Sequence, residues 1–158
     1  MSFKTWITYG YGVKISDINI TRLTNDKLAD FIHLAPYFEE KYLQWIDNTF
    51  REEGDPDCIY EILPVEKMLE YESDYDTYTG LLPILKAVLD EVEGLYFVMC
   101  NDFEGEEFLL FTPAYPWEMS KRERELSRSE VEKIYKKYIS KLTDVEFPID
   151  YYEVENGG

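Results

Sequence analysis

The chain has 158 residues, with 33 Asp and Glu against 16 Lys and Arg, and its formal net charge at pH 7 is −17. This acidic balance argues against direct binding to a nucleic-acid backbone, because affinity for phosphate comes from Lys and Arg. It also argues against docking on an anionic membrane surface, which requires basic clusters. Since 45% of the residues are apolar and 16% are aromatic, the chain differs from a disordered acidic tail and can form a packed core.

The length predicts a single domain over residues 1–158. No apolar run reaches the length of a membrane-spanning helix, and residues 1–7 lack the basic and apolar segments of a signal peptide. Cys58 and Cys100 are the only cysteines, whereas small secreted domains usually carry more. We therefore expect a cytoplasmic protein with two reduced, buried thiols.

The N-terminal segment alternates between apolar and polar residues, which is typical of β-structure. Residues 3–9 and 11–15 carry this pattern, and Gly10 and Gly12 stand between them. Glycine inside such a pattern marks a bend or a break. The segment therefore predicts either a pair of strands or one bent strand.

Two helices are predicted next. Residues 24–26 offer N-caps for the first, and Pro36 breaks or restarts it. Between Phe38 and Phe50, apolar residues recur at helical spacing, which predicts an amphipathic helix that ends near Gly54.

The middle of the chain is harder to interpret. Residues 58–63 fit a strand or a helix, and this choice stays open. Residues 65–72 have the spacing of a short helix, and residues 70–78 form an acidic loop. Residues 81–92 predict another helix, for which Gly94 is the expected C-terminal residue.

A β-hairpin is predicted in the second half of the chain. Residues 95–100 are continuously apolar, as expected of a central strand buried on both faces. A turn over residues 101–107 leads to a second strand over residues 108–111.

The C-terminal part begins with a helix. Ser127 and Glu130 make a capping box at the start of a helix over residues 128–142. Alternation over residues 145–151 predicts a last strand, and Pro148 places it at a sheet edge because proline cannot donate to a ladder. The order of elements predicts an α+β fold with a mainly antiparallel sheet, made of one or two N-terminal strands, a central β-hairpin and a C-terminal edge strand, packed by four or five helices.

The charge is distributed unevenly. Residues 1–120 hold 8 basic and 24 acidic side chains, and residues 142–158 hold no basic and 5 acidic side chains. Residues 121–141 hold 8 basic and 4 acidic side chains. The helix over residues 128–142 is thus either a solvated face with local ion pairs or a basic patch that accepts the acidic face of a second copy, which makes it a candidate homo-oligomer contact.

Three runs of acids stand out, at residues 52–57, 70–78 and 102–107. Each fits a solvated loop. The run at residues 70–78 differs because tyrosines interleave with the acids, and tyrosine is enriched at interface hot spots. The candidate partner-binding residues in the first two runs are Glu52, Glu53, Asp55, Asp57, Glu70, Tyr71, Glu72, Asp74, Tyr75, Asp76 and Tyr78.

Motifs for catalysis or metal binding are missing from the sequence. His33 is the single histidine and fits a structural or surface position. There is no nucleophile elbow and no phosphate-binding loop. Two distant cysteines and one histidine do not make a zinc site, and residues 74–85 start like a calcium loop but lack its later Gly and Glu. We expect no catalytic residues, no cofactor and no bound metal.

This acidic, aromatic-rich composition without catalytic motifs resembles that of phage-borne inhibitors that mimic nucleic acid. The resemblance implies a non-enzymatic binding or inhibitor protein that occupies a basic, nucleic-acid-binding surface of a partner protein, such as a host defence nuclease, and that itself binds neither nucleic acid nor membrane. Acidic charge would steer such a partner at long range. Two alternatives stay open: a small cytoplasmic enzyme with a carboxylate-lined, metal-assisted site, and an intracellular toxin-neutralising or housekeeping interaction domain.

Overall fold

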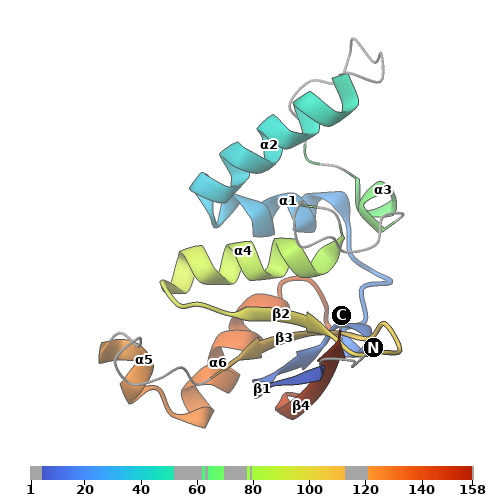
Figure 1. The fold of residues 1–158 in the computed structure, drawn as a ribbon. Helices are drawn as coiled ribbons and strands as arrows, with labels where there is room; N and C mark the ends of the chain where they lie inside the picture. Colours follow the sequence, from blue (N-terminus) through green and yellow to red (C-terminus); the bar gives the residue numbers. More distant parts are fainter. Residues whose placement is uncertain are drawn as a thin grey trace. The chain divides into compact units, whose positions relative to one another are not determined.

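The structure, a computed structural model, has the α+β architecture that the sequence predicts (Figure 1). It describes residues 5–51, 62, 64–69, 78, 80–112 and 121–157. The chain divides into two compact units. We call Met1–Arg22 together with Leu95–Gly158 the sheet unit, and Leu23–Gly94 the helical unit. A single domain over residues 1–158 stays a prediction.

In the described part of the sheet unit, four strands form an antiparallel sheet in the order β2-β3-β1-β4. The strands are β1 (Thr5–Lys14), β2 (Val98–Asn101), β3 (Glu107–Phe111) and β4 (Asp150–Gly157). β1 pairs with β4 over residues 5–12 and with β3 over residues 11–14. The first and last strands of the chain therefore lie side by side (Figure 1). A short 3-10 helix, η1 (Ile15–Asp17), follows β1.

β1 is one continuous strand, as in the second of the two predicted alternatives. Two glycines allow β3 to approach it closely. A Cβ at Gly12 would lie 1.9 Å from the carbonyl oxygen of Leu109, and a Cβ at Gly10 would lie 2.4 Å from that of Phe111. Any larger residue at these positions would collide with the backbone of β3.

β2 and β3 form the predicted hairpin. Its turn is held by Asp102, whose carboxylate accepts hydrogen bonds from the backbone N–H groups of Glu104 at 2.9 Å and Glu106 at 3.0 Å. Gly105 has a φ of 85°, a left-handed conformation that favours glycine. Local turn chemistry therefore explains why the sequence located this hairpin correctly.

The prediction of a central strand over residues 95–100 is wrong. β2 begins only at Val98 and lies at an edge of the sheet. Leu95 and Phe97 are buried before the strand begins, and Cys100 is the buried residue within it. The apolar run thus covers both a buried connection and a short edge strand. This explains why the sequence of residues 95–100 has the pattern of one central strand.

The last strand lies at the opposite edge, as predicted, but it begins at Asp150 and not at Val145. Pro148 precedes the strand instead of lying within it. Because proline has no backbone N–H, the ladder starts beyond this residue.

Helix α6 (Arg128–Ile139) packs against one face of the sheet, and the shorter α5 (Lys121–Glu125), which was not predicted, precedes it (Figure 1). The N-cap half of the predicted capping box is confirmed, since the Ser127 side chain accepts a hydrogen bond from the Glu130 N–H at 3.2 Å. Tyr135 is fully buried, and its hydroxyl donates to the backbone oxygen of Tyr11 at 3.0 Å. This bond ties α6 to the middle of β1.

The helical unit contains α1 (Asn25–His33), α2 (Pro36–Arg51), α3 (Val65–Leu69) and α4 (Leu81–Glu93). Helices α1, α2 and α4 contribute the apolar stripes predicted from helical spacing. Fully buried side chains of this core include Leu28, Phe31, Ile32, Tyr42, Ile46, Leu82, Leu85 and Leu89. The open choice at residues 58–63 falls outside the described residues, apart from Ile62.

Several of the described helix ends in this unit are capped by side chains or by glycine. The Thr24 side chain caps α1, accepting a backbone hydrogen bond at 3.2 Å. The Glu91 carboxylate, from α4, accepts hydrogen bonds from the first N–H groups of α2, at 3.1 Å from Tyr37 and 2.8 Å from Phe38. Gly94 ends α4 with a φ of 63°, as predicted. Within the described residues, no helix has the length and apolar character needed to cross a membrane.

Candidate functional site

The residues predicted to bind a partner lie almost entirely outside the described residues. This holds for Glu52, Glu53, Asp55, Asp57, Glu70, Tyr71, Glu72, Asp74, Tyr75 and Asp76. Tyr78 is described, and it packs in an aromatic cluster of the helical unit. Its ring centroid lies 5.4 Å from that of Phe38, 6.3 Å from Tyr42 and 6.2 Å from Trp45. The structure therefore gives this tyrosine a packing contact within its own unit.

A separate group of aromatic residues, on the surface of the sheet unit, lies where β1 and β4 pair. The register places Tyr11 opposite Tyr151 and continues in steps of two residues. Residues directly opposite each other in an antiparallel pair project from the same face of the sheet. The residues that share this face, in opposite pairs, are Tyr11 and Tyr151, Tyr9 and Glu153, and Ile7 and Glu155; we call these six residues the tyrosine face.

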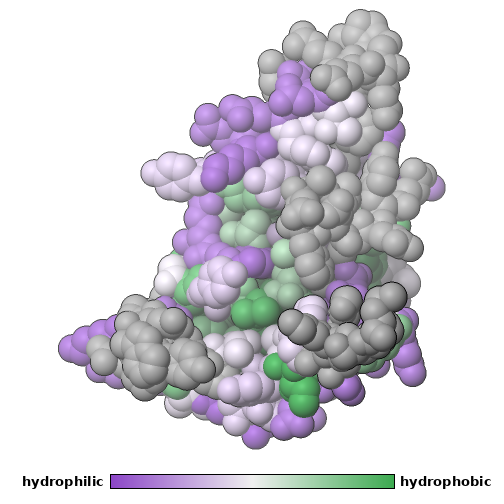
Figure 2. Space-filling view, viewed as in Figure 1, coloured by the Kyte–Doolittle hydropathy of each residue, from purple (hydrophilic) through white to green (hydrophobic). Residues whose placement is uncertain are grey.

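The three tyrosines form a row. The ring of Tyr151 lies between the other two, with centroid distances of 5.4 Å to Tyr11 and 6.5 Å to Tyr9. Exposure rises away from α6: Tyr11 is half-buried, whereas Tyr151 is 42%, Tyr9 43% and Ile7 58% exposed. In Figure 2, pale and green residues appear beside purple ones over β1 and β4, in the lower part of the view. Contiguous exposed aromatic and apolar side chains of this kind mark interaction sites.

An arginine already lies on one end of this row. The guanidinium carbon of Arg128 is 4.8 Å from the ring centroid of Tyr11, within the range of a cation–π contact. The same side chain pairs with Glu132 at 3.2 Å and approaches Asp150 at 3.8 Å. The tyrosine face thus accommodates a guanidinium in contact with both an aromatic ring and carboxylates.

The other end of the row is acidic. Glu153 and Glu155 are both exposed, and Lys14, the basic residue within β1, lies on the opposite face of the sheet. Desolvation, the Glu153 carboxylate and the neighbouring tyrosines together raise the pKa of Tyr151 above its usual value. A cation placed here would gain from the negative potential that disfavours ionisation of this hydroxyl.

Sequence reasoning missed the tyrosine face. The alternation of tyrosines at positions 9 and 11 was visible, and so was Tyr151. What the sequence does not contain is the pairing of β1 with β4, which joins the two ends of the chain in one register. Only that pairing places these tyrosines in a row.

The basic side of α6 lies in the same unit. Lys133, Lys136 and Lys137 are exposed on it, as is Lys141 just beyond the helix. An open hollow of about 540 Å³ lies at the N-terminal part of the helix. Lys121, Glu125, Leu126, Glu130, Lys133 and Ile134 line it. Both interpretations of this helix, a solvated face or a contact with a second copy, stay predictions.

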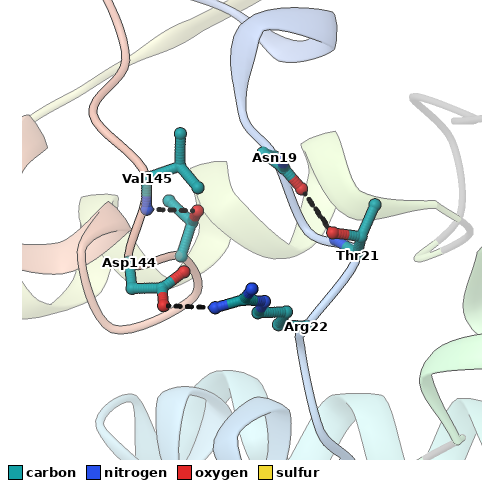
Figure 3. A network of polar contacts seen from close by, with 6 residues as sticks. Asn19, Thr21, Arg22, Asp144 and Val145 are labelled. Atoms are coloured by element: carbon teal, nitrogen blue, oxygen red, sulfur yellow. Dashed lines mark hydrogen bonds and ion pairs between the residues drawn. The ribbon is translucent and has the colours of Figure 1, made fainter.

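A second hollow, of about 440 Å³, lies beyond the C-terminal end of α6. It is lined by Lys136, Ser140, Thr143, Asp144, Val145, Glu146 and Phe147. Arg22 reaches Asp144 at 3.5 Å, and the neighbouring Asn19 side chain accepts hydrogen bonds from Thr21 (Figure 3). Arg22 and Asp144 are 82% and 61% exposed at their side chains, so this ion pair contributes little to stability.

Part of the acidic run at residues 102–107 has a structural role in the β2–β3 hairpin. Asp102 holds the hairpin turn, and Glu106 accepts a hydrogen bond from the Ser16 hydroxyl at 2.9 Å. Glu104 is exposed at the tip. The run therefore serves the hairpin first, and its exposed carboxylates add to the acidic surface.

In the part of the chain that the structure describes, titratable groups suited to catalysis or metal binding are dispersed. Among the described residues, no three His, Cys, Asp or Glu side chains gather closely enough to hold a metal ion. Cys100 is buried, and this burial, with a smaller effect of Asp102, raises the pKa of its thiol to about 11. His33 is exposed, and its Nδ1 atom contacts the Glu39 carboxylate. No described Asp or Glu is a buried residue, although one carboxylate oxygen of Asp47 is shielded from solvent.

Comparison with protein-family models, with curated proteins and with solved structures finds no match.

Proposed function

We propose that this chain is a non-enzymatic acidic binding protein that occupies a basic, nucleic-acid-binding surface of a partner protein. The observation that carries the proposal is the exposed tyrosine face on a chain of net charge −17. Neither half of this observation is enough alone. Acidic charge by itself serves solubility, whereas tyrosines on a sheet surface supply contact area with little loss of side-chain entropy.

Carboxylates can take the place of phosphates on a partner. A protein that binds nucleic acid presents Lys and Arg side chains to a row of negative charges. An acidic surface offers the same partner a competing set of charges, and it accelerates the encounter at low salt. The resemblance in composition to phage-borne inhibitors extends the proposal to host defence nucleases as the class of partner.

The proposed location is the cytoplasm. Its support is chemical: the chain has only two cysteines, and Cys100 is a buried free thiol. Thiols persist in reduced form in that compartment, where disulfides are rare.

A capture experiment with competition tests the proposal. The full chain is immobilised and exposed to host lysate at about 50 mM and about 200 mM salt, with an unrelated acidic protein of similar charge as the control matrix. We expect nucleic-acid-binding proteins to be retained on the chain, to be released by added duplex DNA, and to be lost at the higher salt. Retention of no basic protein at the lower salt, or retention that duplex DNA does not reduce, would contradict the proposal.

A further inference from the structure

We propose that the tyrosine face is a docking surface for an extended segment of the partner that carries arginines at alternate positions. This inference rests on the proposed function, because it names the site and the chemistry through which a basic partner would be held. It goes beyond that function because it assigns the binding to one face of the sheet unit and to one kind of partner side chain.

The internal contact of Arg128 is the first argument. Its guanidinium lies 4.8 Å from the centre of the Tyr11 ring and pairs with the Glu132 carboxylate at 3.2 Å. Tyr151 and Tyr9 continue the same row, and their rings are exposed. The chain thus fills the first position of the row with its own arginine and leaves the next two rings open to arginines from outside.

Charge complementarity is the second argument. Glu153 lies opposite Tyr9, and Glu155 lies opposite Ile7, so two carboxylates follow the open rings along β4. Of the residues in β1 and β4, Lys14 is the basic one, and it lies on the other face. A cation arriving here therefore meets aromatic rings and carboxylates, and the strands add no positive charge of their own to repel it.

Spacing is the third argument. The two open rings, those of Tyr151 and Tyr9, have centroids 6.5 Å apart, which is close to the spacing of about 7 Å between alternate residues of a strand. Alternate side chains of an extended segment lie on one side of its backbone at the same spacing. Two arginines separated by one residue can therefore reach both positions at once.

Arginine fits these positions better than lysine does. Its planar guanidinium stacks on a tyrosine ring and can bind a carboxylate through two parallel hydrogen bonds. The lysine ammonium is a compact, strongly hydrated charge that loses more hydration on such a surface. A preference for arginine consequently separates this site from general attraction to a chain of charge −17.

The test uses the full chain and fluorescently labelled peptides. One peptide carries arginines at alternate positions, a second carries lysines at the same positions, and a third is neutral. Binding is measured by anisotropy at about 50 mM salt. We expect the arginine peptide to bind at least about threefold more tightly than the lysine peptide, and the neutral peptide not to bind.

Three variants locate the site. The first, Glu153→Gln with Glu155→Gln, removes the two carboxylates, and the second, Tyr9→Leu with Tyr151→Leu, removes the two rings. The control, Asp30→Asn with Glu40→Gln, removes two exposed negative charges from the helical unit. We expect about tenfold weaker binding of the arginine peptide for each face variant and less than about twofold for the control. Circular dichroism verifies that each variant is folded, and the carboxylate variant keeps the test decisive where the loss of two tyrosines perturbs the strands.

Equal effects of the face and control variants would overturn the inference, as would equal binding of the two basic peptides or no binding of the arginine peptide. Self-association of the wild-type chain that both face variants abolish would identify a second copy as the occupant and would overturn it as well. The capture experiment reports on the function independently. If wild type and face variants retain the same DNA-displaceable partner, the inference fails and the proposed function stands. If the face binds arginine peptides but no such partner is found, the function fails and the site stands.

Discussion

Tyr42 is fully buried in the helical unit, and its hydroxyl has no hydrogen-bond partner within the described residues. A buried polar group without a partner costs about 1–3 kcal/mol. We therefore expect Tyr42→Phe to leave the free energy of unfolding unchanged or to raise it by about 1 kcal/mol. Urea unfolding at neutral pH checks this, with Tyr9→Phe as the control because its hydroxyl is in an exposed residue. A loss of stability greater than about 1 kcal/mol for Tyr42→Phe would show that the hydroxyl is hydrogen-bonded after all.

The same residue predicts an alkaline effect. Burial raises the pKa of Tyr42 far above its ordinary value of 10.0. Because the folded-state pKa is the higher one, the contribution to stability is fully present below pH 10 and is lost as the pH rises above it. Wild type should therefore lose stability above pH 10 more steeply than Tyr42→Phe. Parallel pH profiles of the two proteins would contradict this assignment.

Cys100 should be chemically inert in the folded protein. Its thiol pKa is raised from 9.0 to about 11, which lowers the thiolate fraction at pH 8 by about 100-fold. We expect alkylation of Cys100 to be at least that much slower in the folded chain than in denaturant, since burial also limits access. Mass spectrometry of the peptide that contains Cys100 measures this rate separately from that of Cys58. Equal rates with and without denaturant would show that the thiol is accessible and not buried as described.

The elements that are predicted best from the sequence depend on contacts between residues close together in the chain. The capping box of α6, the glycine that ends α4 and the turn of the hairpin each depend on residues within a few positions of one another. Such contacts depend mainly on neighbouring residues, so one sequence is enough to predict them.

Strand boundaries and sheet position were harder to predict because they depend on partners elsewhere in the chain. The apolar run at residues 95–100 indicates burial, but it does not tell a buried connection from a central strand. Neighbours decide this: β3 separates β2 from β1, and β2 becomes an edge strand. Hydrophobic periodicity indicates which residues are buried, but it does not indicate which strand lies next to a given strand.

The close approach of β1 to β3 depends on glycine at a position where the backbones touch. A Cβ at Gly12 would lie 1.9 Å from the Leu109 oxygen, whereas a Cβ at Gly94 would meet nothing within 4 Å. Gly94→Ala should cost only the strain of its left-handed backbone, about 1 kcal/mol. Gly12→Ala should cost at least about 2 kcal/mol, because the β1–β3 ladder must shift. Urea unfolding of the two variants compares these costs, and a Gly12→Ala effect no larger than that of Gly94→Ala would refute the close approach.

The tyrosine face and the net charge are properties of the molecule as a whole. The sequence predicted an acidic, aromatic-rich surface, and its candidate residues at 52–57 and 70–77 lie outside the described residues. The aromatic surface that the structure describes comes from pairing residues 5–12 with residues 150–157. This pairing cannot be derived from spacing in one chain, because the residues that meet are separated by almost its full length.

A net charge of −17 also acts on the molecule as a whole. Self-repulsion destabilises the compact state, and salt screens it within about 10 Å at about 0.1 M. We expect the thermal unfolding midpoint to rise between about 10 mM and about 0.1 M sodium chloride. Sodium acetate at the same ionic strengths serves as the control for specific effects of the anion. A midpoint that falls with salt would show that local ion pairs outweigh the repulsion.

Binding of the captured partner in the presence of duplex DNA tests the central claim most directly. Purified partner is bound to labelled duplex DNA at about 50 mM salt, and the chain is added in increasing amounts. If the chain occupies the nucleic-acid-binding surface, DNA and chain exclude each other, and the apparent affinity of the chain falls in proportion to the DNA concentration. A ternary complex of partner, DNA and chain, with an affinity for the chain that does not depend on DNA, would contradict the account.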